Sequence, residues 1–135
     1  AFCLGAEGVQ IGSRFVTSNE SSAHINFKET VVQAQEGATT LTLKELAPVR
    51  LIRNKFFDEL QEAYARCASV EELKSILGRA RAKKGMFEGD LDEGELEIGQ
   101  VSGSIHEVIP AADIVAEIWH EFKEVSGQMN QYSKN

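Results

Sequence analysis

The stretch Gly5-Ala-Glu-Gly-Val-Gln-Ile-Gly-Ser-Arg-Phe15 decides the fold that this sequence predicts. Gly5 can provide the left-handed end of a helix whose last turn is residues 1–4. An extended apolar run follows, which predicts a buried strand over residues 8–16; its apolar members are Val9, Ile11 and Phe15. The stretch therefore predicts a helix end, a buried strand and a turn in succession.

The turn at the carboxyl end of this predicted strand contains Gly12 and Ser13. A residue without a side chain lets the backbone approach an anion closely, and the serine hydroxyl adds a hydrogen-bond donor. A helix that begins just afterwards would direct its first N–H groups to the same point. The turn predicts a phosphate site, with an ordinary turn after a buried strand as the alternative that the residues alone leave open.

Several separated segments carry a resemblance to one flavoenzyme family. They occur in order along the chain: Leu-Gly-Ala-Glu-Gly-Val-Gln-Ile-Gly-Ser-Arg-Phe-Val (4–16), Glu-Ser-Ser-Ala-His (20–24), Pro-Val-Arg-Leu-Ile-Arg-Asn (48–54), Glu-Gly-Asp (88–90) and Gly-Gln-Val-Ser-Gly (99–103). Together they resemble the carboxyl-terminal portion of the nitronate monooxygenase (2-nitropropane dioxygenase) family. That family also includes the FMN-dependent enoyl-acyl-carrier-protein reductases II.

The resemblance implies an α/β fold, the carboxyl-terminal part of a (β/α)8 TIM-type barrel with a mostly helical lid insertion. Residues 1–16 would be the last barrel strand with its preceding helix end, and 17–98 the lid and connection. Residues 99–126 would be the return segment with the final barrel helix, and 127–135 a frayed tail. A complete barrel of this kind takes about 250 residues, and this chain has 135. We therefore expect it to be part of a longer polypeptide.

The resemblance also implies the site. It assigns the FMN phosphate to the backbone of four residues, Gln10, Ile11, Gly12 and Ser13. Gln100 and Ser102 lie on a glycine-flanked loop that either closes over the flavin region or simply begins a helix. The catalytic residues of the family are expected upstream of this segment, so we assign none here. Half of the phosphate cradle, after the seventh strand, would also lie upstream.

The activity implied for the intact protein is that of an FMN-dependent oxidoreductase. The first expectation is a nitronate monooxygenase, in which a nitronate anion reduces the flavin and dioxygen follows. The alternative is an enoyl reductase II that passes hydride from NAD(P)H through FMN to an enoyl thioester. A rival of another class is a non-enzymatic helical module, whose apolar stripes at residues 56–77 and 110–125 would bind a partner. The barrel hypothesis predicts a homodimer or association with the missing barrel portion.

Composition restricts the class of protein. The net charge of −7, from 14 basic and 21 acidic residues, argues against a nucleic-acid binder, which normally presents a basic face. No apolar run approaches the length needed to span a bilayer, so no membrane partner is expected, and the cytoplasm is the default location. Cys3 and Cys67 are far apart and are expected to be reduced thiols.

Local patterns predict the other elements. Apolar spacing and candidate caps predict helices over 20–35, after Asn54, after Ser69 and over 110–125; β-branched alternation predicts strands over 39–43 and 48–53. Five glycines between residues 85 and 103 predict a loop that bends repeatedly rather than a packed element.

Three groups of charged residues invite a functional interpretation. His24, in a polar helix start, is expected to cap or be solvated; His106 could face the active site, and His120 is expected at a surface or an interface. The acidic stretch 90–97 lacks the ligand spacing of a calcium loop and predicts a solvated turn. The basic run over 79–84 predicts a solvated surface, with a phosphorylated nucleotide or acyl carrier as the alternative.

Overall fold

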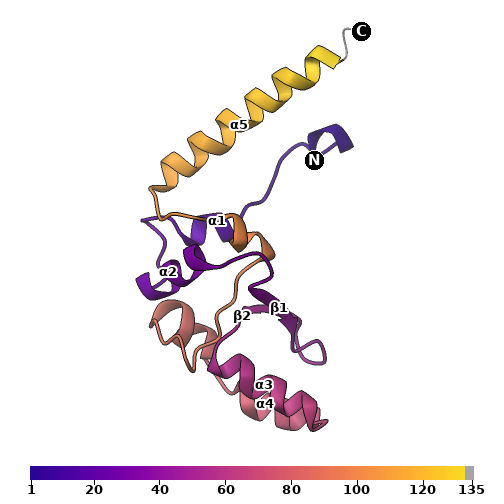
Figure 1. Cartoon of the computed structure of the whole chain (residues 1–135), viewed down its shortest axis with the longest axis vertical. Helices are drawn as coiled ribbons and strands as arrows, with labels where there is room; N and C mark the ends of the chain where they lie inside the picture. Colours follow the sequence, from indigo (N-terminus) through magenta and orange to yellow (C-terminus); the bar gives the residue numbers. More distant parts are fainter. Residues whose placement is uncertain (133–135) are drawn as a thin grey trace.

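The computed structural model of this chain describes residues 1–132, and the side chains of residues 1–129. The elements in chain order are η1 (Phe2–Leu4), α1 (Ser13–Val16), α2 (Ile25–Gln33), β1 (Thr39–Thr42), β2 (Val49–Ile52), α3 (Lys55–Ala65), α4 (Val70–Leu77), η2 (Lys83–Phe87), η3 (Gln100–Ser104) and α5 (Ala111–Tyr132). They form an elongated molecule, with α3 and α4 at one end and α5 projecting from the other (Figure 1).

The end with α3 and α4 has strong local signals for its secondary structure. Asn54 caps α3 by accepting a hydrogen bond from Phe57 N, and Ser69 caps α4 through Glu72 N, as the sequence predicts. Strands β1 and β2 pair antiparallel, close to the predicted 39–43 and 48–53. One hydrophobic core joins these elements; its buried members are Leu43, Leu51, Phe56, Phe57, Leu60, Ala63 and Leu73.

The prediction of an unpacked loop over 85–103 is wrong for residues 94–98. Ile52 N donates to Leu96 O at 3.0 Å and Ile98 N donates to Arg50 O at 3.1 Å, so this segment lies along β2 like a third strand. Leu96 and Ile98 are buried in a second core; its other buried members are Phe27, Val31, Ile52 and Ile105. The glycines allow this packing because Gly85 and Gly94 bring two backbones together where no Cβ fits.

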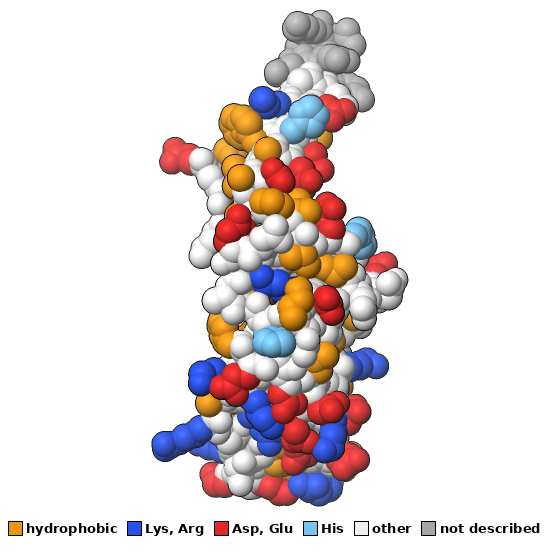
Figure 2. All heavy atoms as spheres, turned by 90° about the vertical axis from the view of Figure 1, so that its left-hand side faces the viewer, with side chains coloured by type: hydrophobic (Ala, Val, Ile, Leu, Met, Phe, Trp, Pro, Cys, Tyr) orange, Lys and Arg blue, Asp and Glu red, His pale blue; other side chains and the backbone are white. Residues whose placement is uncertain are grey.

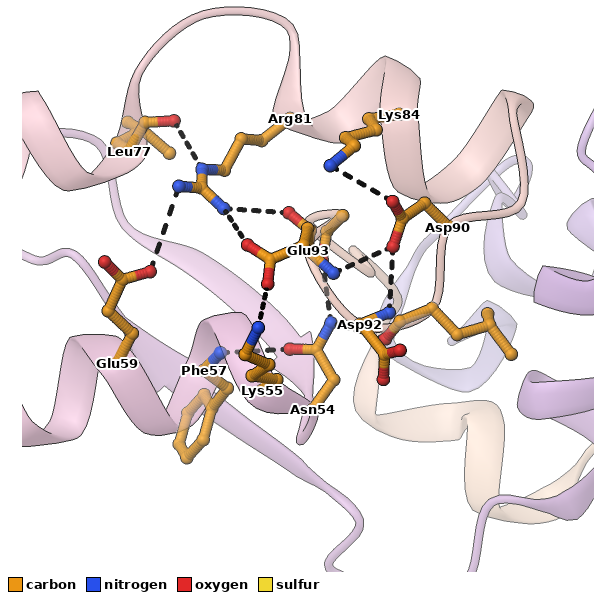
Figure 3. A network of polar contacts seen from close by, with 12 residues as sticks. Asn54, Lys55, Phe57, Glu59, Leu77, Arg81, Lys84, Asp90, Asp92 and Glu93 are labelled. Carbon is orange, nitrogen blue, oxygen red and sulfur yellow. Dashed lines mark hydrogen bonds and ion pairs between the residues drawn. The ribbon is translucent and has the colours of Figure 1, made fainter.

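A polar network closes the same end of the molecule (Figure 3). Arg81 lies over the Phe56 ring, with its guanidinium carbon 4.4 Å from the centroid, and donates to Leu77 O and Glu93 O. Glu93 also pairs with Lys55. We refer to residues 39–98, which contain the first core, this network and the returning segment, as the 39–98 module.

Helix α2 begins at Ile25, five residues later than the predicted start at residue 20. Serine hydroxyls hold the preceding residues in turns, since Ser18 Oγ accepts from Ser21 N and Ser21 Oγ accepts from Ala23 N. Lys28 is buried, and its ammonium group donates to three carbonyls of this loop: Ser18 O at 2.6 Å, Ser21 O at 2.9 Å and Asn19 O at 3.4 Å. The lysine therefore fixes the loop to α2.

The predicted strand over residues 8–16 does not form. Gly5 ends a 3-10 helix at φ 90°, as predicted, but the residues that follow are irregular and residues 13–16 form α1. Val9 and Ile11, predicted to be buried, are 60% and 38% exposed. A strand is stable only when neighbouring strands satisfy its backbone groups, and no strand among residues 1–132 lies beside this segment. We call residues 1–12 the arm.

Helix α5 runs from Ala111 to Tyr132, so residues 127–132, expected in a frayed tail, continue this helix; residues 133–135 lie outside the described part of the chain. The helix touches the arm, where the Phe2 and Phe122 rings lie 4.9 Å apart. Large apolar side chains of α5 are exposed: Val115, Trp119, Val125 and Met129. Hydrophobic side chains accordingly gather over the upper half of Figure 2 and charged ones over the lower half.

Candidate functional site

The four residues predicted to hold a phosphate lie at an open turn between the arm and α1. Gln10, Ile11 and Gly12 are exposed and Ser13 is half-buried. None of their backbone N–H groups donates a hydrogen bond to any group in residues 1–132. No atom lies within 4 Å of the point where a Cβ on Gly12 would be. The turn thus presents free donors and open space, which is what the approach of an anion requires.

The structure joins this turn to the second predicted segment. Ser13 Oγ accepts a hydrogen bond from Gly99 N at 3.1 Å, across 86 residues of sequence. A Cβ on Gly99 would lie 2.6 Å from Ser13 Oγ, so only glycine permits this close approach. The serine hydroxyl keeps its own hydrogen for another acceptor. The first and the last of the five segments that carry the family resemblance, 4–16 and 99–103, therefore meet at one point.

A groove of about 390 Å³ opens beside this contact. Its lining comes from the turn, from β2 and from the returning segment: Ser13, Val16, Pro48, Val49, Arg50, Glu97, Ile98 and Gly99. Of the four predicted phosphate residues only Ser13 lines it. The groove thus lies between the predicted cofactor turn and the 39–98 module.

Two charged side chains line the groove that the sequence analysis did not assign, Arg50 and Glu97. Arg50 Nη1 donates to Thr39 O at 3.0 Å, which fixes its guanidinium group to β1. Burial raises the pKa of the Glu97 carboxyl. Neither residue carries a motif; only the pairing of 96–98 with β2, which is a long-range contact, brings them together.

Glu95, two residues earlier, is the most perturbed acid of residues 1–132. Its side chain is buried, and burial, together with the negative charge of Glu97, raises its pKa to about 7. Arg81 opposes this shift only in part. Glu95 does not line the groove, so we regard it as a structural group whose charge costs stability.

The two residues predicted on the active-site loop are placed differently from each other. Gln100 is exposed at the start of η3. Ser102 is 1% exposed, and its hydroxyl has no hydrogen-bond partner among residues 1–132. Neither lines the groove. The loop reaches the site through Gly99, and a role for these two side chains stays a prediction.

The histidines support no catalytic assignment. His24 caps α2, with Nδ1 accepting from Asn26 N at 3.2 Å, which confirms the predicted capping role. His106 is exposed and lines a second pocket beside Arg14, away from the Ser13 groove. His120 is exposed on α5.

The remaining charged groups form ion pairs or turns. Three members of the basic run are paired, since Arg81, Lys83 and Lys84 meet Glu93, Glu88 and Asp90. Asp90 Oδ1 accepts hydrogen bonds from Asp92 N and Glu93 N, and these bonds hold the acidic stretch in a turn. Cys3 and Cys67 are free thiols, as predicted.

The fold and the site define an α/β protein in which an open, donor-rich turn meets a glycine loop beneath a helical module. A model of the nitronate monooxygenase family matches residues 1–121, and the chain belongs to that family. The probable nitronate monooxygenase of Bacillus subtilis is 32% identical over 122 residues, 90% of this chain and 35% of that protein. That of Staphylococcus saprophyticus is 42% identical over 60 residues, 44% of this chain and 17% of that protein.

Solved structures confirm the α/β fold. The structure of FabK from Thermotoga maritima matches with a TM-score of 0.86 and 35% identity, over 97% of this chain and 42% of that chain. The structure of its M276A mutant matches with a TM-score of 0.79. The chain thus spans about a third of the first curated relative and two fifths of FabK. No helix within residues 1–132 has the length and apolarity to cross a membrane.

Proposed function

We propose that this chain is the carboxyl-terminal part of an FMN-dependent oxidoreductase, and that it supplies part of the FMN phosphate site and the lid. The observation that carries the proposal is the hydrogen bond from Gly99 N to Ser13 Oγ, which joins the first and the last of the family-like segments beside a groove. Family membership and the FabK likeness support the same class of enzyme.

The residues present fit the cofactor's phosphate. The free N–H groups of residues 10–13 and the Ser13 hydroxyl are donors, and Gly12 leaves room for a dianionic group to approach the backbone. FMN, when bound, would supply the electron-transfer chemistry of the reaction. The role of this turn would be to hold and orient the phosphate, with further donors from the barrel portion that the family carries outside the matched region.

The 39–98 module would act as the lid over the reacting centre. Pro48, Val49 and Ile98 give one wall of the groove an apolar surface that can exclude water. The module is held rigidly by its own core and by the Arg81 network (Figure 3). A rigid lid would let the groove keep its shape when a ligand enters.

Two substrate classes follow from the relatives. The curated relatives are named as probable nitronate monooxygenases, which supports a nitronate as the substrate. The FabK structures support the alternative, reduction of an enoyl thioester with NAD(P)H as the hydride source. Turnover of a nitronate set against NAD(P)H oxidation with an enoyl thioester would separate them.

The arm and α5 would associate with the rest of the family barrel. Their exposed apolar side chains and the unpaired N–H groups of residues 7–12 in the arm are what an adjoining barrel strand and helix would cover. A homodimer is the second form of association that this surface suits. A cytoplasmic location fits an enzyme of this class.

The phosphate site is tested in intact protein containing this chain, with flavin affinity as the readout. Gly12→Ala places a methyl group in open space within the chain, so it should leave folding unchanged but obstruct the phosphate. We expect FMN affinity to fall at least about tenfold, while riboflavin, which lacks the phosphate, is unaffected. Gly8→Ala, which also meets no atom within 4 Å, is the matched control.

The rival helical module predicts a colourless protein. Purified intact protein without a flavin absorbance band, and without FMN uptake after addition of the cofactor, would reject the enzyme proposal. If Gly12→Ala lowers the affinities for FMN and riboflavin equally, the protein is still a flavoprotein, but the phosphate does not bind at this turn.

A further inference from the structure

Glu97 projects into the groove because of the alternation along the returning segment. Leu96 and Ile98 are buried in the second core, and successive side chains of an extended segment point to opposite sides. Glu97 forms an antiparallel bridge with Leu51 of β2 and lines the groove together with Ser13 and Arg50. A carboxyl group of the lid is thereby placed on the groove that faces the cofactor turn.

This carboxyl group differs from the ion-paired acids Glu93 and Asp90 in having no partner. Glu93 pairs with Lys55 and Arg81, and Asp90 pairs with Lys84 (Figure 3). No hydrogen bond or ion pair within residues 1–132 reaches the Glu97 carboxylate, although Arg50 lines the same groove. A half-buried anion without a partner favours neutral or donor groups nearby and disfavours a second anion.

The arrangement also separates this charge from the proposed phosphate. The N–H groups of residues 10–12 belong to a part of the turn that does not line the groove. A ligand whose phosphate group binds at residues 10–12 would therefore place another part of itself in the groove, where it faces β2 of the lid. Glu97 is the only acidic residue among the described residues that line it.

We propose that Glu97 contacts the substrate, and that its negative charge makes the groove select neutral substrates over anionic ones. The inference rests on the proposed function, since it takes the groove as the substrate side of the flavin site. Within the two substrate classes it favours an uncharged acceptor, such as an enoyl group, over a nitronate anion. Removal of the charge should shift this preference without abolishing flavin binding.

The test uses flavin-loaded intact protein and two ligands that differ by one proton, 2-nitropropane and its nitronate. Their dissociation constants are measured from the initial change in flavin absorbance on rapid mixing without dioxygen, before the nitronate can reduce the flavin. The pH is about 9, where even a carboxyl whose pKa is raised by burial is ionised. Glu97→Gln keeps the shape of the side chain and should lower the dissociation constant of the nitronate about tenfold relative to that of 2-nitropropane. Glu97→Asp, which retains the charge, should keep the wild-type ratio.

Glu29→Gln is the matched control, because Glu29 is exposed on α2, which contributes no residue to the groove. An unchanged ratio in Glu97→Gln, or the same change in Glu29→Gln, overturns the charge selection while the bound flavin still supports the proposed function. Protein that binds no flavin overturns both. Circular dichroism of each variant shows that the fold is intact.

Discussion

The 39–98 module carries a closed hydrophobic core of its own, whereas the arm and α5 leave their apolar side chains exposed. Leu51 and Leu60 are fully buried in the module, while Trp119 on α5 is 57% exposed. Both regions have amphipathic helices, so the difference lies in whether a partner face is present in the chain. The comparison indicates that stability of this chain resides in the module, and it supports the proposal that the other end is an interface.

The largest expected effect comes from breaking the core of the module. Leu60 is completely buried, so Leu60→Ala removes its contacts and leaves a cavity; we expect a loss of about 3 kcal/mol in the free energy of unfolding. Denaturant unfolding measured by circular dichroism checks this value. Val115→Ala on α5 is the matched control, because Val115 is 56% exposed, and it should change stability by less than about 0.5 kcal/mol. Equal losses would contradict the comparison.

Two glycines, one in the module and one in α5, test the same comparison through backbone packing. A Cβ on Gly85 would lie 2.6 Å from the Glu95 carbonyl oxygen, so Gly85→Ala must displace one of two packed segments and should cost about 2 kcal/mol or more. Gly127 in α5 meets no atom within 4 Å, so Gly127→Ala should instead stabilise the helix by about 0.5 to 1 kcal/mol. Thermal unfolding should therefore shift in opposite directions for the two variants. A shift in the same direction would show that the 85–95 contact is not formed.

Glu95 makes the stability of the module depend on pH. Its pKa is about 7 in the folded chain against 4.5 as the ordinary value, so the folded state binds more protons between these values. Stability should therefore fall as pH rises from about 4.5 to 7 and change little from this group above 7. Glu95→Gln should remove most of this slope and stabilise the module at about pH 8 by roughly 2 kcal/mol. Glu29→Gln, at an exposed position, should retain the wild-type slope in the same titration.

The smallest effect on folding is expected at the interface end, where the change should instead be seen in association. Trp119 and Val125 are exposed on α5, so Trp119→Ser and Val125→Ser should each alter the free energy of unfolding by less than about 0.5 kcal/mol. Sedimentation velocity should show less self-association than for the unchanged chain. A large destabilisation with unchanged association would mean that this face is packed within the chain.

Short-range sequence signals were sufficient to predict much of the secondary structure of the 39–98 module. The caps Asn54 and Ser69 sit where side-chain oxygens can reach N–H groups two or three residues on, and both were predicted from the sequence. The end of η1 at Gly5 follows from the same kind of short-range chemistry. These features need no information from distant residues.

The failures concern residues whose conformation depends on partners far along the chain. The apolar run at 8–16 fits a strand, but no neighbouring strand is present among residues 1–132, so it does not form one. The glycines of 85–103 suggested an unpacked loop, yet Gly85 and Gly94 permit close packing and Leu96 joins the second core. The groove residues Arg50 and Glu97 carry no motif and are adjacent only through that packing.

The amino-acid sequence by itself determined the family, the α/β class, the helices and strands of the module and the segments that form the candidate site. Only the tertiary structure decided that Ser13 meets Gly99, that Glu97 enters the groove, and that the arm stays without a strand partner. The physical reason is range: caps and periodicity act within a few residues, whereas close approach of backbones and the placement of an unpaired charge depend on packing between distant parts of the chain.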